Sequence, residues 1–170
     1  MRLRPARPGD IDALAELERY FPSDRLSRAR FRYLLRRGHA DIRVCEHDGA
    51  LVGDAVSLYR RGTKIARLYS LVVHPGHQRR GIARLLLQAA EAAADARGCR
   101  ELRLEVRPDN VPAIRFYQNA GYRLAGRIAD YYEDGTEALR MSKRLAAPEE
   151  FSAPSRPPRR PASGASCPTP

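Results

Sequence analysis

LYSLVVHPGHQRRGIARLLL, residues 68–87, is the most informative segment of this chain. Its first part, up to Val73, reads as a strand, and the run His74-Pro75-Gly76 stops that strand. Gly81 then opens a segment rich in Ala and Leu, which predicts a helix. A helix that follows a short glycine-containing turn presents unpaired backbone N–H groups, and its dipole favours negative charge at the same end. The segment therefore predicts a phosphate-binding turn between a strand and a helix.

Three arginines, Arg79, Arg80 and Arg84, supply positive charge around this turn. The turn is neither a Walker loop, which requires GxxxxGK[ST], nor the Rossmann GxGxxG. A plain helix N-terminus bordered by surface arginines would give the same residues, so the turn alone leaves both interpretations open.

On both sides of this segment, strand and helix patterns alternate without an internal repeat, which predicts one α/β domain over residues 1–145. Ser27 and Asn110 are expected to cap helices, and Asp48-Gly49 suits a tight hairpin turn. The order βααβββαβαββ predicts a mixed, mostly antiparallel sheet flanked by about four helices. The expected strands are 1–7, 40–46, 50–59, 64–73, 101–106, 122–128 and 137–145, and the expected helices follow Asp10, Ser27, Gly81 and Asn110.

Two details of the helices are also predicted. The side chain of Asp10 is placed to cap the first helix. In the long helix, 82–97, the residues Leu85, Leu86, Ala89 and Ala93 are expected to form the buried stripe.

A chain of 170 residues and 19.1 kDa accommodates one domain with a substantial core and does not accommodate two. With 43% hydrophobic and 30% charged residues, the composition is globular, and no apolar run reaches the roughly 18 residues of a membrane-spanning helix. Residues 1–9 lack the apolar run of a secretory signal, so a cytoplasmic location without membrane contact is expected. Cys45, Cys99 and Cys167 are widely spaced, which predicts reduced thiols and no metal.

The net charge of +11 comes almost wholly from arginine, because Lys64 and Lys143 are the only lysines. Such a charge attracts phosphates, nucleic acids and anionic cofactors, although arginine placed on solvated faces by base bias would give the same balance. Residues 146–170 hold 7 of the 13 prolines and one large apolar residue, Phe151, so they are expected to form a disordered Pro/Ser/Arg-rich tail.

The pattern Gln78-x-x-Gly81-x-Ala83 resembles the pyrophosphate-binding signature [R/Q]-x-x-G-x-[G/A] of the GNAT superfamily of acetyltransferases. Ala83 stands where a second glycine is commoner, which the signature tolerates. Three further segments agree in order and spacing: LEVRPDN at 104–110, AIRFYQNAGY at 113–122 and DYYEDGTEALRMSKRL at 130–145. Within the superfamily they resemble the branch that acetylates protein N-termini, typified by the ribosomal-protein alanine acetyltransferases. The resemblance covers residues 1–145.

The resemblance implies a sheet splayed open at the acetyl-CoA site and a reaction that transfers acetyl from this co-substrate to a primary amine. It implies that Glu105 is the general base and Tyr117 the general acid, and that Phe21, Pro22, Tyr131 and Tyr132 face the acceptor. The positions that it matches to cofactor binding are Leu71, Val72, Val73, Gln78, Arg79, Arg80, Gly81, Ile82, Ala83, Arg84, Asn110 and Tyr117.

The chemistry gives each role a physical reason. An α-amine is partly protonated at neutral pH, so a carboxylate within one water of it can prepare it for attack, and a phenol can protonate the leaving thiolate. Alternatives remain: Glu105 could form an ion pair with Arg103 or Arg107, Tyr117 could be a core residue, and Asn110 could be mainly a helix cap.

The acceptor is the most open question. The charge of +11 disfavours polycationic amines and modestly favours a protein N-terminus, with a small-molecule or lysine amine as the alternative. A remote alternative is a ribosome- or RNA-binding module without catalysis; a nucleic-acid substrate is not expected, and the chain is expected to act as a monomer or homodimer.

Overall fold

The computed structural model describes residues 1–20 and 25–145. The expected order of strands and helices is confirmed along this part of the chain. The elements are β1 (Arg2–Pro5), α1 (Ile11–Leu17), α2 (Arg28–Arg36), β2 (Ala40–His47), β3 (Ala50–Tyr59), β4 (Ile65–Val73), α3 (Ile82–Ala96), β5 (Glu101–Val106), α4 (Val111–Asn119), β6 (Arg123–Ile128) and β7 (Ala138–Arg144).

The strands form one sheet in the order β1-β2-β3-β4-β5-β7-β6. Each neighbouring pair is antiparallel except β4 and β5, which are parallel, so the mixed and mostly antiparallel sheet is confirmed. The first hairpin turns at Asp48 and Gly49, both with positive φ, as the sequence indicates.

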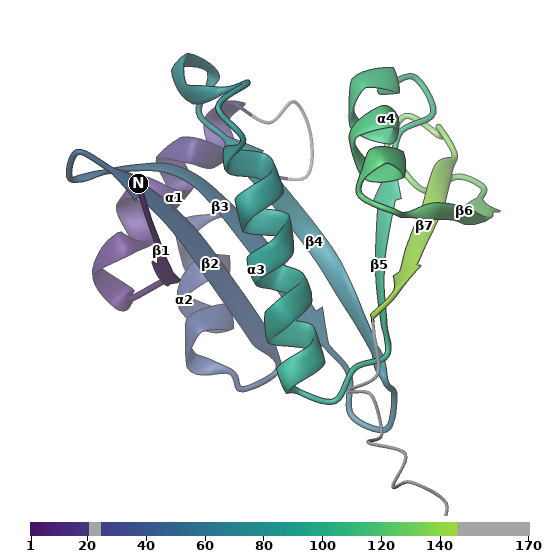
Figure 1. The fold of residues 1–170 in the computed structure, drawn as a ribbon, viewed down its shortest axis with the longest axis horizontal. Helices are drawn as coiled ribbons and strands as arrows, with labels where there is room; N and C mark the ends of the chain where they lie inside the picture. The colour runs from purple at the N-terminus through teal and green to yellow at the C-terminus, as the bar shows by residue number, and fades with distance from the viewer. Residues whose placement is uncertain (21–24, 146–170) are drawn as a thin grey trace, which may run out of the picture.

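Helices lie on both faces of the sheet (Figure 1). The helices α1 and α2 bury Leu14, Phe31 and Leu34 against one face. On the opposite face, α3 buries Leu86 among residues of the sheet, and α4 packs against the same cluster. Because both α3 and α4 lie on that face, the polar face of β5 and β7 remains available for a site.

The sheet opens between β4 and β5. Paired residues join these strands only from Ile65–Arg67 to Glu101–Arg103. Farther along, β4 carries a bulge at Tyr69, since Leu68 pairs with Ser57 while Ser70 pairs with Val56. Figure 1 shows the two strands diverging from the end where they pair toward the end that carries α4. The strand β4 therefore keeps β3 on one side and turns its other edge toward an opening.

Two helix details predicted from the sequence are wrong. Asp10 is the N-cap residue of α1, but its side chain makes no capping hydrogen bond to that helix; its carboxylate accepts hydrogen bonds from the Arg7 backbone N–H over 2.7 Å and from the Arg4 guanidinium, because a short 3-10 turn precedes the helix. In α3, Leu85 is 40% exposed and Ala89 is half-buried. The buried stripe is instead Ile82, Leu86, Leu87, Ala90, Ala93 and Ala94.

The sheet explains why α3 buries Ile82 and Leu86 and leaves Leu85 exposed. A Cβ at Gly53 of β3 would lie 3.0 Å from Leu86 Cδ1 and 3.3 Å from Ile82 Cγ2. The missing side chain at Gly53 lets the start of α3 approach the sheet closely with these two residues. This packing fixes the position of the turn that precedes α3.

Candidate active site

A cleft of about 520 Å³ lies between the diverging strands. At one end it is bordered by the turn before α3 and by α4, and at the other by Tyr131, which bonds to Arg67 near the last paired residues of β4 and β5. The lining residues are Tyr20, 68–73, Pro75, Gln78, 104–107, Asn110, Ala113, Tyr117, Tyr131 and Tyr132. Many of the residues that the sequence singled out are therefore brought to one place.

The turn between β4 and α3 has the backbone that an anion-binding turn requires. Gly81 is the N-cap of α3 with φ of 78°, and Arg79 also has a positive φ of 59°. A Cβ at Gly81 would meet nothing within 4 Å, so the space beside it is open. The turn is closed by His74, whose Nδ1 accepts from the Gly76 N–H over 3.1 Å. The first N–H groups of α3 thus remain available to an anion.

The residues matched to cofactor binding divide into two groups. Leu71, Val72, Val73, Gln78, Asn110 and Tyr117 line the cleft, with Val72 buried and its two neighbours in sequence half-buried. The others form the turn and the first residues of α3 outside the cleft lining: Arg79, Arg80, Gly81, Ile82, Ala83 and Arg84. Ile82 belongs to the core, whereas the three arginines are exposed.

Asn110 caps α4, which was the alternative interpretation of this residue. Its Oδ1 accepts a hydrogen bond from the Ala113 N–H over 3.2 Å. It also lines the cleft. Capping and contact with a bound molecule are compatible at this position.

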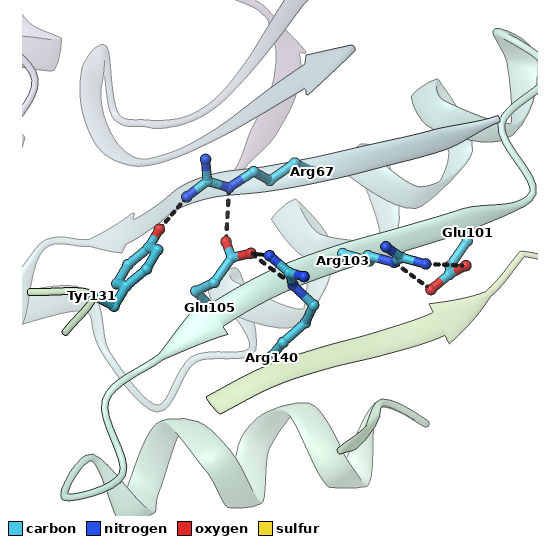
Figure 2. A network of polar contacts seen from close by, with 6 residues as sticks. All are labelled: Arg67, Glu101, Arg103, Glu105, Tyr131 and Arg140. Atoms are coloured by element: carbon cyan, nitrogen blue, oxygen red, sulfur yellow. Dashed lines mark hydrogen bonds and ion pairs between the residues drawn. The ribbon is translucent and has the colours of Figure 1, made fainter. Parts of the chain in front are cut away.

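Glu105 is held between two arginines, as Figure 2 shows. Its Oε2 accepts from Arg67 Nε over 2.7 Å, and its Oε1 accepts from Arg140 Nε and Nη2, each over 3.2 Å. Only 6% of the side chain is exposed. The expected ion-pair partners, Arg103 and Arg107, are wrong: Arg103 binds Glu101 and Arg107 binds Asp134. The actual partners are Arg67 of β4 and Arg140 of β7. Arg140 is directly opposite Glu105 in the sheet.

Tyr117 on α4 lines the cleft and is half-buried. Its ring packs edge-on against Phe116 and Tyr122, with centroid distances of 5.1 and 5.7 Å. Burial raises the pKa of the Tyr117 phenol above its usual value of about 10. The phenol is therefore protonated at neutral pH and able to donate a proton.

The opposite end of the cleft is aromatic. Tyr131 bonds through its hydroxyl to Arg67 Nη2, so that Arg67 links it to Glu105 (Figure 2). The guanidinium of Arg107 lies 4.7 Å from the centroid of the Tyr132 ring. Tyr20 also lines the cleft, but its hydroxyl lies 3.2 Å from Nε2 of His74, in the turn before α3. Phe21 and Pro22, which were expected to face the acceptor, lie outside the described residues.

Sequence reasoning missed several groups at this site. Arg67 and Arg140 could not be assigned to Glu105 because their proximity depends on strand register. Glu18 had a signal, since it lies four residues after Leu14 on the apolar side of the first helix. It is only 1% exposed, and its carboxylate accepts from Ser70 Oγ over 3.0 Å.

Among residues 1–20 and 25–145, no group of His, Cys, Asp and Glu is arranged to hold a metal ion. Within the same described ranges, no helix is both long and apolar enough to cross a membrane. Cys45 and Cys99 are buried free thiols, and Cys167 lies outside these ranges.

Comparisons with known proteins agree with this geometry. The family model described as Acetyltransferase (GNAT) family matches residues 11–122. An N-alpha-acetyltransferase of Sulfurisphaera tokodaii is 30% identical over 155 residues, which cover 85% of this chain and 93% of the relative. The streptothricin acetyltransferase of Streptomyces lavendulae is 35% identical over 99 residues, but the match covers 56% of this chain and 52% of that protein.

Solved structures show the same fold. Ard1 from Thermoplasma volcanium superposes with a TM-score of 0.78 at 25% identity, covering 86% of this chain and 98% of its own. The ribosomal-protein-S18-alanine N-acetyltransferase of Escherichia coli gives 0.76 at 24% identity, covering 88% and 97%. This second likeness concerns the fold alone.

Proposed function

The chain belongs to the GNAT family of acetyltransferases, and from this premise we propose that it transfers the acetyl group of acetyl-CoA to the N-terminal α-amine of a protein. The observation that carries the proposal is the cleft between β4 and β5, which joins an anion-binding turn at one end to an aromatic wall with few unpaired carboxylates at the other. We assign the activity to residues 1–145 and expect it to operate in the cytoplasm.

Acetyl-CoA would supply an acetyl group activated as a thioester. The residues present fit it, because β4 turns to the cleft an edge that is not paired with β5 beyond Arg67, and the turn at Gly81 leaves open space beside the first N–H groups of α3, which a helix leaves without intrahelical partners. We assign Leu71, Val72 and Val73 to the pantetheine arm through their backbone. The N–H groups from Gln78 to Arg84 would bind the pyrophosphate, with the exposed arginines adding charge. Asn110 would add a polar contact.

Proton transfer falls to two side chains on opposite sides of the cleft. Glu105 is the proposed general base, and its enclosure by Arg67 and Arg140 favours transfer through a water rather than direct contact. Tyr117 is the proposed general acid, which protonates the departing thiolate, because burial keeps its phenol protonated.

The acceptor end of the cleft favours a peptide over a polycation. Four carboxylates lie on β5 or close in sequence to Tyr131 and Tyr132: Glu105, Glu133, Asp134 and Glu137. Three of them are paired with guanidinium groups, Glu105 with Arg67 and Arg140, Asp134 with Arg107 and Glu137 with Arg127. Such a wall attracts polycations weakly. Tyr20, Tyr131 and Tyr132 provide the amphipathic surface that a peptide chain can contact.

A small-molecule amine is the second candidate acceptor. The likeness to the streptothricin acetyltransferase favours it, although that match covers about half of the relative.

The test is thiol release from acetyl-CoA with peptides beginning with Ala, Ser or Met, compared with free lysine, spermidine and an aminoglycoside. A peptide whose α-amine is already acetylated serves as the control. The proposal expects turnover on one peptide class, reduced about a hundredfold in Glu105→Gln and in Tyr117→Phe. Turnover on small amines alone would refute the proposed acceptor.

A further inference from the structure

Glu18 and Ser70 form a buried polar pair in the wall of the cleft, and the proposed proton transfers do not use it. Glu18 follows α1 and is 1% exposed, while Ser70 on β4 is 7% exposed and lines the cleft. The Ser70 hydroxyl donates to Glu18 Oε1 over 3.0 Å, and the Leu26 backbone N–H donates to Oε2 over 3.0 Å. Both oxygens of the carboxylate are therefore engaged within the protein.

The direction of the first bond decides what Ser70 offers to the cleft. A serine hydroxyl has one hydrogen to donate and two lone pairs that accept. Since the hydrogen of Ser70 is committed to Glu18, only its lone pairs can serve a molecule in the cleft. Ser70 thus presents a hydrogen-bond acceptor, whose natural partner is an N–H group.

The bulge in β4 places this oxygen beside the opening of the sheet. Because Tyr69 is skipped in the pairing with β3, Ser70 directs its side chain to the face covered by α1, where Glu18 meets it. Arg67, from the same strand, binds Glu105 of β5. Ser70 and Glu105 therefore stand on the two diverging strands and border one cleft.

We propose that Ser70, held by Glu18, binds the primary amine of the acceptor through one of its N–H groups. This inference rests on the proposed function, because it names the group that receives the acceptor in that reaction. In this arrangement the amine donates one N–H to the Ser70 oxygen, so the lone pair of its nitrogen stays free to attack. Ser70 touches the substrate, whereas Glu18 is a positioning residue that acts through Ser70.

Glu18→Gln is the informative variant, because the Leu26 N–H fixes how a glutamine can sit. The amide oxygen must face that N–H, so the amide NH₂ group faces Ser70. Ser70 then accepts from the glutamine and turns its own hydrogen to the cleft. The variant keeps the number of internal hydrogen bonds but offers the amine a donor in place of an acceptor.

The experiment is a double-mutant cycle on kcat/KM for the acceptor, together with the Kd of acetyl-CoA. Ser70→Ala is expected to lower kcat/KM about tenfold, the effect of one lost hydrogen bond, and Glu18→Gln to lower it at least as much. In the Ser70→Ala background, Glu18→Gln should change kcat/KM by less than about twofold, because no hydroxyl remains to reverse. The Kd of acetyl-CoA should stay within about twofold throughout.

Ser57→Ala is the matched control, since Ser57 is a buried serine on β3 outside the lining of the cleft. It should behave as wild type in kcat/KM. The inference is overturned if Ser70→Ala resembles Ser57→Ala, if the two losses multiply in the double variant, or if acetyl-CoA binding weakens in parallel with kcat/KM. These assays use whichever amine the panel shows to be acetylated. A small-molecule acceptor would refute the proposed N-terminal specificity but not this inference. With that acceptor, a loss of activity in Ser70→Ala would still support the inference, and full activity in Ser70→Ala would overturn it.

Discussion

Arg67 Nε lies 2.7 Å from Glu105 Oε2, at the point where β4 and β5 separate. The bond spans the two strands just beyond their last paired residues, Arg67 and Arg103. It ties the carboxylate proposed as the base to the strand proposed to hold the co-substrate. The position of Glu105 in the cleft therefore depends on a partner from the opposite wall.

Arg67→Met should lower kcat/KM for the acceptor about tenfold or more, because it releases Glu105 and Tyr131 from their shared guanidinium. The Kd of acetyl-CoA should not change, because Arg67 is not among the residues that line the cleft and does not belong to the turn before α3. Steady-state kinetics and calorimetry measure the two quantities.

Arg103→Met is the control for that substitution. Arg103 is the partner of Arg67 in the sheet, but it binds Glu101, away from the cleft (Figure 2). An equal loss of activity in both variants would show that the arginines act only by supporting the sheet.

Gly81→Val should raise the Kd of acetyl-CoA about tenfold or more. A β-branched residue is strained at a φ of 78°, and its side chain would enter the open space beside the turn. Gly98→Val is the matched control, because Gly98 has a φ of 77° at the other end of α3. Both variants should lose roughly 1–2 kcal/mol of unfolding free energy, and only Gly81→Val should lose affinity. Equal Kd values would refute the role of the turn.

The alkaline side of the pH profile should reflect the raised pKa of Tyr117. With a peptide acceptor, kcat should rise as the α-amine loses its proton near pH 8 and should not fall again up to about pH 10. The phenol keeps its proton over that range because burial disfavours the phenolate. A decline in kcat that begins near pH 9 in wild type and is absent from Tyr117→Phe would contradict this assignment of pKa.

Asp54 should make the protein less stable as pH rises. The side chain is fully buried, and neither carboxylate oxygen has a hydrogen-bond partner among the described residues. Burial, with the nearby charge of Glu18, raises the pKa of Asp54 well above its usual value. The folded state therefore binds a proton that the unfolded chain releases above about pH 4, so stability falls from there up to the folded pKa.

Asp54→Asn removes that titration and should raise the free energy of unfolding at pH 7 by roughly 1 kcal/mol or more. The gain should shrink toward zero as the pH approaches 4. Urea unfolding at both pH values measures it. A gain that is the same at pH 4 and pH 7 would show that the ionisation of Asp54 is not its cause.

Local signals sufficed to predict the order of the elements. The cap at Ser27, the turn at Asp48-Gly49 and the strand patterns were correct because each depends on neighbours in sequence. Apart from the missing side-chain cap at Asp10, which a local 3-10 turn explains, what failed depends on distant contacts. The buried face of α3 follows from Gly53 on another strand, and the partners of Glu105 follow from the register of β4 and β7. The pairing of Glu18 with Ser70 likewise needs the helix and the bulged strand to be placed together.

The most direct test of the central claim uses a peptide that begins with alanine and contains one internal lysine. The peptide is incubated with the protein and acetyl-CoA, and fragmentation by mass spectrometry locates the acetyl group. We predict acetylation of the α-amine with the lysine unmodified. Acetylation of the lysine alone, or no acetylation where a small-molecule amine is readily modified, would contradict the proposed function.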